Sequence, residues 1–385
     1  MDEEFIYLDH AAATPLDERV LEVMQPYFSK QFYNPSSPYR QAVEIRRDYE
    51  AAKQRLANCI GGKGGELVIT AGATESINLM FGSVSGHVVT ASIEHQSVLA
   101  AARLHDHTLV GVDNKGRVDP TSIEQAIRPD TELVSVGLAN SEIGTIQPLR
   151  AIAEIVIAER RRRQSNGETV PIYFHTDASQ GLGQLDVHVA RLGVDALTAN
   201  AGKVYGPKQV GLLWTNPFVV LRPNIVGGGQ ERGLRSGTEN VAGVIGFAEA
   251  MEMAVSRKNA ESKRLSELRD GLEKSLIEAF PDAVLSGARG KRLPGHLHIS
   301  FPGVDAERLI FLLENSGVMV ATGSACAANK GTRSHVLEAI GLDPLVADGS
   351  LRITLGRLNN SEAMTRATDI IVKAIKSERA RIGFS

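Results

Sequence analysis

The sequence has few of the features that mark secreted or membrane proteins. Its 385 residues include only two cysteines, which cannot form a disulfide framework, so we expect a reducing compartment. Residues 1–4 are acidic, unlike the basic start of a signal or transit peptide. No apolar run approaches the length that spans a bilayer. Together these absences predict a cytoplasmic protein with no membrane partner.

The charge of the chain is nearly balanced. A net charge of −3 gives no electrostatic reason to expect direct nucleic-acid binding. The sequence also shows no internal repeat and no low-complexity linker. Its length is too great for one small core, which indicates two domains.

Short apolar runs alternate with amphipathic stretches through the first two thirds of the chain. The runs are apolar almost throughout, as expected for strands that are buried on both faces of a sheet. We predict strands at 66–70, 87–91, 133–139, 171–176, 196–199 and 211–214. This rhythm predicts an α/β fold, a mainly parallel sheet sandwiched by helices, with its site at the carboxyl ends of the strands.

The character of the sequence changes after about residue 251. We expect a charged helix from 256 to about 278, strands at 296–301 and 350–355, and a last helix from about 361. Asp305 is placed to cap another helix. We therefore predict a large domain of residues 16–255 and a smaller α+β domain of residues 1–15 and 256–385.

An aspartate and a lysine follow two of the predicted strands. Asp177 ends one run and Lys203 follows another, so both should project at the same edge of the sheet. An arbitrary pair of this kind is most simply an ion pair. Pyridoxal phosphate (PLP) chemistry, however, needs this arrangement, because the lysine forms a Schiff base and the aspartate keeps the pyridine nitrogen protonated.

Two further segments fit the same edge. After the run 67–70, Gly72 lets the backbone approach a ligand, and the helix start with the Thr74 hydroxyl suits a phosphate. This segment contains neither a Gly-Lys-Ser/Thr loop nor a GxGxxG fingerprint. His95 follows the run 87–91, where we expect it to stack on the cofactor ring and move protons rather than to be merely structural.

The two cysteines have different surroundings. Cys326 lies in residues 322–331 among glycine, serine and alanine, where little is bulky enough to pack against it. We interpret it as a nucleophile on a mobile arm, because a thiolate is the strongest nucleophile among common side chains. Cys59 continues the helix face of Leu56 and Ile60, which predicts core packing.

Together these motifs resemble those of class V, fold-type I PLP enzymes, and specifically of cysteine desulfurases, which supply sulfur for iron–sulfur clusters and tRNA thiolation. The resemblance runs nearly end to end. Besides the segments above it includes Tyr7-Leu8-Asp9-His10-Ala11-Ala12, Asn34-Pro35-Ser36-Ser37, Glu94-His95, Ala139-Asn140-Ser141-Glu142-Ile143-Gly144, Gly227-Gly228-Gly229-Gln230-Glu231-Arg232-Gly233-Leu234-Arg235-Ser236-Gly237-Thr238, Leu293-Pro294-Gly295 and Leu351-Arg352-Ile353.

The resemblance implies a role for each residue of the site in binding either the cofactor or the substrate. Lys203 would carry PLP, Asp177 would pair with the pyridine nitrogen, and His95 would stack on the ring. The other implied cofactor contacts are Gln180, Ala73, Thr74, Asn140, Asn200 and, from the second subunit of a homodimer, Thr238. Arg352, with Asn140 and Ala11, would bind the substrate L-cysteine, since a guanidinium suits a carboxylate.

The implied reaction converts L-cysteine to L-alanine and leaves a persulfide on Cys326. That sulfur would pass to an acceptor protein, either an iron–sulfur scaffold or a tRNA-thiolation factor. Catalysis would rest on Cys326, Lys203 and His95, with no metal ion. Two alternatives stay open: a related lyase or aminotransferase in which Cys326 is a bystander, and a non-enzymatic subunit that has lost PLP.

The chain departs from the family pattern beside Lys203. The family usually reads Ser-x-His-Lys, whereas this chain reads Asn200-Ala201-Gly202-Lys203. In the family that serine and histidine help to hold the cofactor phosphate. A hydrogen bond to a charged group contributes about 1.5–3 kcal/mol, so we expect weaker PLP binding unless Asn200 or water compensates.

A run of arginines and two pairs of histidines are further candidates for binding sites. Residues 160–163 are four arginines at a helix end, where we expect a solvated face, with a docking patch as the alternative. His105 and His107, and likewise His296 and His298, have the spacing of metal ligands on a strand. Neither pair has a nearby cysteine or carboxylate cluster, so we expect no metal site.

Overall fold

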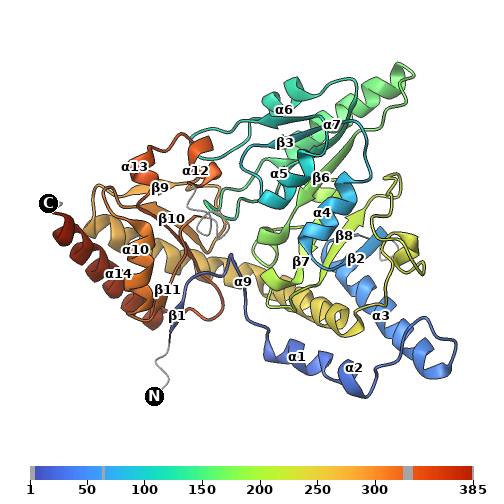
Figure 1. Ribbon diagram of the computed structural model, residues 1–385, viewed down its shortest axis with the longest axis horizontal. Coiled ribbons are helices and arrows are strands. Elements are labelled where there is room, and N and C mark those ends of the chain that lie inside the picture. The colour runs from blue at the N-terminus through green and yellow to red at the C-terminus, as the bar shows by residue number, and fades with distance from the viewer. Residues whose placement is uncertain (1–4, 63–65, 324–332, 384–385) are drawn as a thin grey trace.

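The chain forms two lobes that lie side by side in the computed structural model, which describes residues 5–62, 66–323 and 333–383. The long helix α9 (Val241–Ala279) runs from the larger lobe into the smaller one (Figure 1). Strand β1 (Ile6–Tyr7) belongs to the smaller lobe, and the chain then crosses to the larger lobe. The smaller lobe therefore contains residues from both ends of the sequence.

A mixed, mainly parallel sheet of seven strands forms the centre of the larger lobe. The spatial order is β2–β8–β7–β6–β5–β3–β4, and β8 runs antiparallel to both of its neighbours while the other pairs are parallel. The strands are β2 (Leu67–Thr70), β3 (His87–Ala91), β4 (His107–Val110), β5 (Thr131–Ser135), β6 (Tyr173–Asp177), β7 (Ala196–Asn200) and β8 (Gly211–Thr215). The predicted α/β fold is confirmed.

The strand predictions differ from the structure mainly at the ends. The run 133–139 is strand only as far as Ser135, and β6 extends to Asp177 itself. Strand β4 was not predicted, because it lies at the edge of the sheet and Leu109 is exposed to solvent there. A half-exposed edge strand lacks the continuous apolar run that marked the others.

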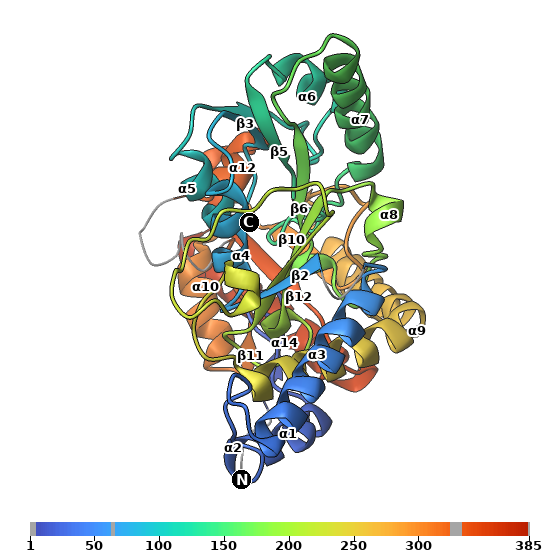
Figure 2. The same ribbon diagram turned by 90° about the vertical axis from the view of Figure 1, so that its right-hand side faces the viewer.

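Both faces of the sheet are covered by helices, which explains the continuous apolar runs. On β2, Leu67 and Ile69 belong to the same core as Leu56 of α3 (Arg40–Cys59), whereas Val68 between them belongs to the core that contains Ile77 of α4 (Ala73–Phe81). Figure 2 shows α4 and α5 (Gln96–Ala102) on one side of the sheet and α3, α8 (Val189–Leu192) and α9 on the other.

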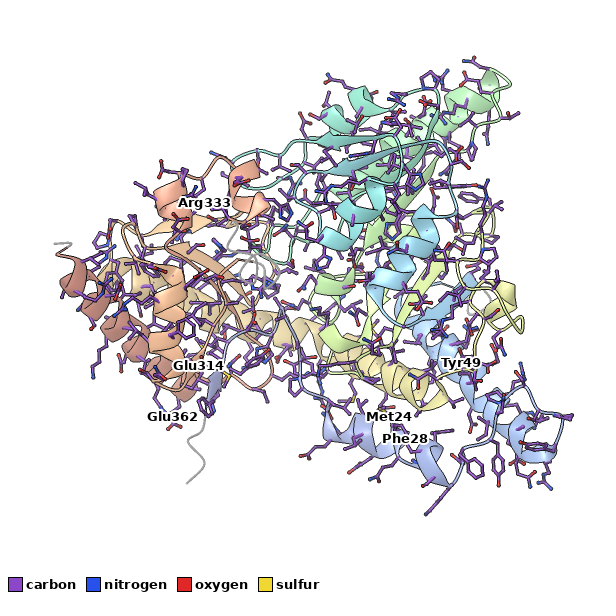
Figure 3. The ribbon with its side chains drawn as sticks, viewed as in Figure 1. Met24, Phe28, Tyr49, Glu314, Arg333 and Glu362 are labelled. Atoms are coloured by element: carbon purple, nitrogen blue, oxygen red, sulfur yellow. The ribbon has the colours of Figure 1, made fainter. Side chains whose placement is uncertain are left out.

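The helices of the larger lobe differ widely in length. They are α1 (Glu18–Met24), α2 (Pro26–Ser29), α3 (Arg40–Cys59), α4 (Ala73–Phe81), α5 (Gln96–Ala102), α6 (Pro120–Ala126), α7 (Leu149–Ser165) and α8 (Val189–Leu192). Met24 at the end of α1 is buried against α9, where a Cβ at Gly246 would lie 2.4 Å from its sulfur, while Phe28 on α2 is exposed (Figure 3). No helix among the described residues is long and apolar enough to cross a bilayer.

The smaller lobe combines a short antiparallel sheet with helices. Its strands are β9 (Val284–Ser286), β10 (His296–Ser300) and β12 (Ser350–Thr354), and β1 pairs in parallel with β11 (Val318–Met319). Its helices are α10 (Ala306–Glu314), α13 (Pro344–Ala347) and α14 (Ser361–Ile382), whereas α12 (His335–Ala339) packs Val336 and Leu337 into the core of the larger lobe. Asp305 caps α10 as predicted, because its carboxylate accepts hydrogen bonds from the N–H groups of Glu307 and Arg308.

The helix predicted to begin at residue 256 is the second half of α9, which begins at Val241. The first half was missed because it is buried nearly all round and so lacks an amphipathic pattern. Ala254 belongs to the core of the larger lobe, whereas Leu265 joins the separate core that includes Ile6 and Leu8. These cores support the division near residue 255, which stays a prediction.

The expectation of a solvated face at residues 160–163 is wrong for half of the run. Arg163 is 2% exposed, and its guanidinium donates hydrogen bonds to the carbonyls of Thr131 and Val170 and to the Glu159 carboxylate. Arg160 forms an ion pair with Asp195. These arginines tie α7 to the ends of the central strands, which leaves a buried cation with its donors satisfied.

Candidate active site

A cavity of about 260 Å³ opens at the carboxyl ends of the central strands. It brings together predicted site residues from segments that are far apart in the sequence. Its walls include Ala11, Ala73, Thr74, His95, Asn140, Asp177, Gln180, Asn200, Lys203 and Arg352. Thr238 is exposed and does not line this cavity in the single chain. The predicted nucleophile, Cys326, lies outside the described residues.

Lys203 projects into the cavity from the turn that follows β7. Its ammonium donates hydrogen bonds to the carbonyls of Ala11, at 2.8 Å, and Ala12, at 2.7 Å. Burial lowers the pKa of Lys203, and the nearby Arg352 guanidinium lowers it further. The amine is therefore more readily available as a nucleophile and base than an exposed lysine would be.

Asp177 is the last residue of β6, a strand that side-chain hydrogen bonds hold on both sides. Its carboxylate accepts a hydrogen bond of 2.9 Å from the N–H of Ser179. Two residues earlier, the His175 ring lies 2.9 Å from the hydroxyl of Ser135 on one side and 2.9 Å from that of Thr198 on the other. Burial lowers the pKa of His175 to about 4, so its ring is neutral and this part of the site is held by neutral hydrogen bonds.

His95 lies at the start of α5 and caps that helix. Its Nδ1 accepts a hydrogen bond of 3.1 Å from the N–H of Ser97, which fixes the orientation of the ring. Burial lowers the pKa of His95 below its ordinary value, and Asp177 partly opposes the shift. A neutral imidazole on the cavity wall is suited to accept and return a proton.

Glu94, which was not predicted, also lines the cavity. Its carboxyl accepts a hydrogen bond of 2.9 Å from the N–H of Gly137, and a Cβ at that glycine would lie 2.9 Å from its other oxygen. Burial raises the pKa of Glu94 to about 8. Its contact with Gly137 joins segments 43 residues apart, which residue spacing alone does not predict.

Arg352 reaches the cavity from β12 of the smaller lobe. It is 4% exposed, and its guanidinium donates a hydrogen bond of 2.7 Å to the Asp9 carboxylate. The Gln180 amide donates to the carbonyl of Ala11 at 3.1 Å. The N-terminal segment and both lobes therefore meet around Lys203, with one guanidinium facing the space beside its amine.

Asn140 uses its amide to shape the cavity wall. The amide nitrogen donates to the carbonyl of Ile93 at 2.8 Å, and the amide oxygen accepts from the N–H of Glu142 at 2.9 Å. Both ends of the side chain are therefore engaged with the backbone. In this arrangement Asn140 holds the turn that faces the cavity.

The N-terminus of α4 forms the other end of the cavity. Gly72 precedes the helix with a φ of 145°; among the described residues, a Cβ there would meet no atom within 4 Å and no side chain caps the helix. The first N–H groups of α4 and the exposed Thr74 hydroxyl are thus available to an anion. Asn200 accepts a hydrogen bond of 3.1 Å from the N–H of Gly202.

These residues fit PLP on their own chemistry. Lys203 can hold an aldehyde, Asp177 can pair with a ring nitrogen, and the start of α4 can receive a phosphate.

Cys59, by contrast, is partly buried against the core, and burial raises the pKa of its thiol to about 11, as for a packing residue. Among the described residues, no group of three or more histidine, cysteine, aspartate or glutamate side chains is placed to hold a metal ion.

Comparison with known proteins gives one consistent result. A family model described as aminotransferase class-V matches residues 6–366. The chain is 39% identical to the cysteine desulfurase IscS of Dictyoglomus turgidum, over 97% of this chain and 95% of that protein. Among solved structures it resembles a NifS-like protein, with a TM-score of 0.88, 34% identity and coverage of 97% and 100%. It also resembles SspA in complex with cysteine, with a TM-score of 0.76, 32% identity and coverage of 91% and 98%.

Proposed function

This chain belongs to the class-V aminotransferase family and, within it, to the PLP-dependent cysteine desulfurases, and from that premise we propose how its residues divide the work. The substrate is L-cysteine and the products are L-alanine and a sulfur atom carried by the protein. The observation that carries this proposal is that Lys203, Asp177 and Arg352 line one cavity. Together they provide an amine, a partner for a pyridine nitrogen and a partner for a carboxylate.

PLP, when it is bound, acts as an electron sink for negative charge that develops on the substrate Cα. The Lys203 amine would hold the cofactor aldehyde, and as a base it would remove the substrate Cα proton and return it before alanine leaves. Its lowered pKa supports both roles, because more of the neutral amine is present at neutral pH. Asp177 keeps the ring nitrogen protonated, and its support by Ser179 holds it in place.

The substrate carboxylate binds to Arg352. The guanidinium lines the cavity and is held by Asp9 at 2.7 Å and by a long hydrogen bond of 3.5 Å to the carbonyl of Ser141. The Cys326 thiolate attacks the substrate sulfur, a sulfur–sulfur bond forms and the carbon–sulfur bond breaks. The electron pair left on carbon takes up a proton to become the methyl group of alanine, and His95 is the residue that supplies or relays protons near the sulfur.

The fate of the sulfur follows from the same assignment. The persulfide on Cys326 passes to an acceptor protein, for iron–sulfur cluster assembly or tRNA thiolation. The protein acts as a homodimer in the cytoplasm, and Thr238 completes the phosphate site of the second subunit. The exposure of Thr238 in the single chain supports this last assignment.

The test uses purified full-length protein and L-cysteine. We expect a visible absorption band from bound PLP and the release of alanine, with sulfide released when a thiol reductant is present. Cys326→Ser should keep the band and lose turnover, whereas a lyase or aminotransferase would keep turnover. Protein that stays colourless with excess PLP would overturn the proposal.

A further inference from the structure

A second cavity, of about 610 Å³, adjoins the first and is also lined by Lys203. The two cavities share four of the residues assigned above: Ala73, Thr74, Asn200 and Lys203. The second cavity is also lined by Gly202, Lys208 and Glu75. The end of the site assigned to the cofactor phosphate therefore opens into additional space.

Gly202 borders this opening and leaves it unfilled. A Cβ at Gly202 would lie 3.6 Å from the Asn200 side-chain oxygen and 3.7 Å from Cγ of Lys208, which are ordinary contact distances. The φ angle of Gly202 is not in the left-handed region. Neither sterics nor backbone conformation thus requires glycine here, and the missing side chain leaves room beside the start of α4.

The loop after β7 brings Lys208 back to this gap. The N–H of Ala201 bonds to the carbonyl of Val210 at 3.0 Å, and the N–H of Gly206 bonds to the carbonyl of Ala201 at 3.0 Å. Gln209 has a φ of 61°, a conformation that a non-glycine residue adopts only where its surroundings impose it. The loop is therefore closed on itself, with the stem of Lys208 alongside Gly202.

The ammonium of Lys208 is available to a ligand. Within the part of the chain that the structure describes, Lys208 forms no ion pair or hydrogen bond. Glu75, a carboxylate in the same cavity, bonds instead to Arg235 and to the N–H of Ala71, at 2.9 and 2.7 Å. A free cation next to free helix N–H groups is the arrangement that binds a phosphate.

We propose that Lys208 binds the phosphate of PLP and takes the place of the side chain that Gly202 lacks. The Lys208 ammonium lies three bonds beyond Cγ, and from there it can extend into the gap at residue 202. This inference rests on the proposed function, because it presupposes that PLP occupies the first cavity. It assigns the cofactor one positive charge that the start of α4 and Asn200 do not supply.

The test measures cofactor affinity rather than turnover. Apoprotein is titrated with PLP and, separately, with pyridoxal, which has the aldehyde but no phosphate, and binding is followed by visible absorbance. Lys208→Met should weaken PLP binding about tenfold or more, the effect of losing one hydrogen bond to a charged group. Pyridoxal binding should be unchanged, and Lys208→Arg should retain most of the PLP affinity.

A matched control and a rescue complete the design. Lys274→Met removes an exposed lysine from α9 and should leave both affinities unchanged. Gly202→His, introduced into the Lys208→Met protein, should restore PLP affinity, because the gap at residue 202 accepts a Cβ at ordinary distances.

Three results would overturn the inference. They are a Lys208→Met protein that binds PLP within twofold of wild type, one that loses affinity for pyridoxal and PLP equally, and one whose weaker binding follows a change in oligomeric state on a sizing column. Wild-type protein that binds no PLP would instead refute the proposed function itself.

Discussion

The two ends of the candidate site are built in contrasting ways. At the Asp177 end, the buried His175 ring lies between the hydroxyls of Ser135 and Thr198, so the strands support the aspartate before any ligand arrives. At the Gly202 end, the start of α4 has no cap and Lys208 has no partner among the described residues. One end is complete in the free protein, and the other offers donors that are still to be satisfied.

This difference indicates that one end of the site orients the cofactor ring and the other end provides affinity for the cofactor phosphate. A preorganised partner for the ring nitrogen controls the electronic state of the cofactor, which must be fixed throughout the reaction. Free N–H groups and a free ammonium supply binding energy when an anion arrives. We therefore expect changes at the Asp177 end to act mainly on rate and changes at the Gly202 end mainly on cofactor retention.

Replacing the residue between the two ends should have the largest effect. Lys203→Ala removes both the tether and the proposed base, so desulfurase activity should fall by more than about a thousandfold. The visible band of the tethered cofactor should disappear as well. Absorbance spectra and alanine production check both, with Lys274→Met as the exposed-lysine control. Retention of the band would show that another amine tethers the cofactor.

Asp177→Asn tests the preorganised end alone. The amide keeps the shape and the bond from Ser179 but loses the charge, so turnover should fall roughly ten- to a hundredfold, the value of one hydrogen bond between charged groups. Cofactor content should remain near that of wild type. Turnover and cofactor absorbance, measured on the same sample, distinguish this outcome from loss of binding, which would place the role of Asp177 in affinity instead.

The sequence is sufficient to predict those parts of the candidate site that lie at the ends of strands. Asp177, Lys203 and His95 follow buried parallel strands, and the rule that such ends share one edge places them together. The structure brings all three to one cavity.

The contacts that the sequence could not give are those between distant segments. The carbonyls of Ala11 and Ala12 bond to Lys203 because the N-terminal strand joins the smaller lobe and leads back past the site. Lys208 meets Gly202 through a loop whose closure depends on a left-handed residue. Neither side-chain periodicity nor residue spacing encodes contacts of these kinds.

The buried carboxyl of Glu94 should make the free energy of unfolding depend on pH. Burial raises its pKa to about 8, so the folded protein keeps a proton that the unfolded chain releases above about pH 4.3. Stability from this group is thus fully present below about pH 4.3 and is lost as the pH rises toward 8. Glu94→Gln keeps an acceptor for Gly137 and removes the titration.

The difference in the free energy of unfolding between the Glu94→Gln apoprotein and the wild-type apoprotein should therefore shift in favour of the variant as the pH rises from 5 to 8. The expected shift is on the order of a few kcal/mol. Urea unfolding at both pH values measures the gain. An equal difference between the two proteins at pH 5 and pH 8 would show that Glu94 does not titrate in this range.

The smallest effect comes from removing one hydroxyl at each end. Ser135→Ala leaves a buried nitrogen of His175 without its partner and should lower the free energy of unfolding of the apoprotein by about 1–3 kcal/mol. Thr74→Ala removes an exposed hydroxyl and should change it by less than about 0.5 kcal/mol, while PLP binding weakens. Urea unfolding and PLP titration of both variants give the comparison directly. Equal losses of stability would mean that the free protein holds the Gly202 end as firmly as the Asp177 end.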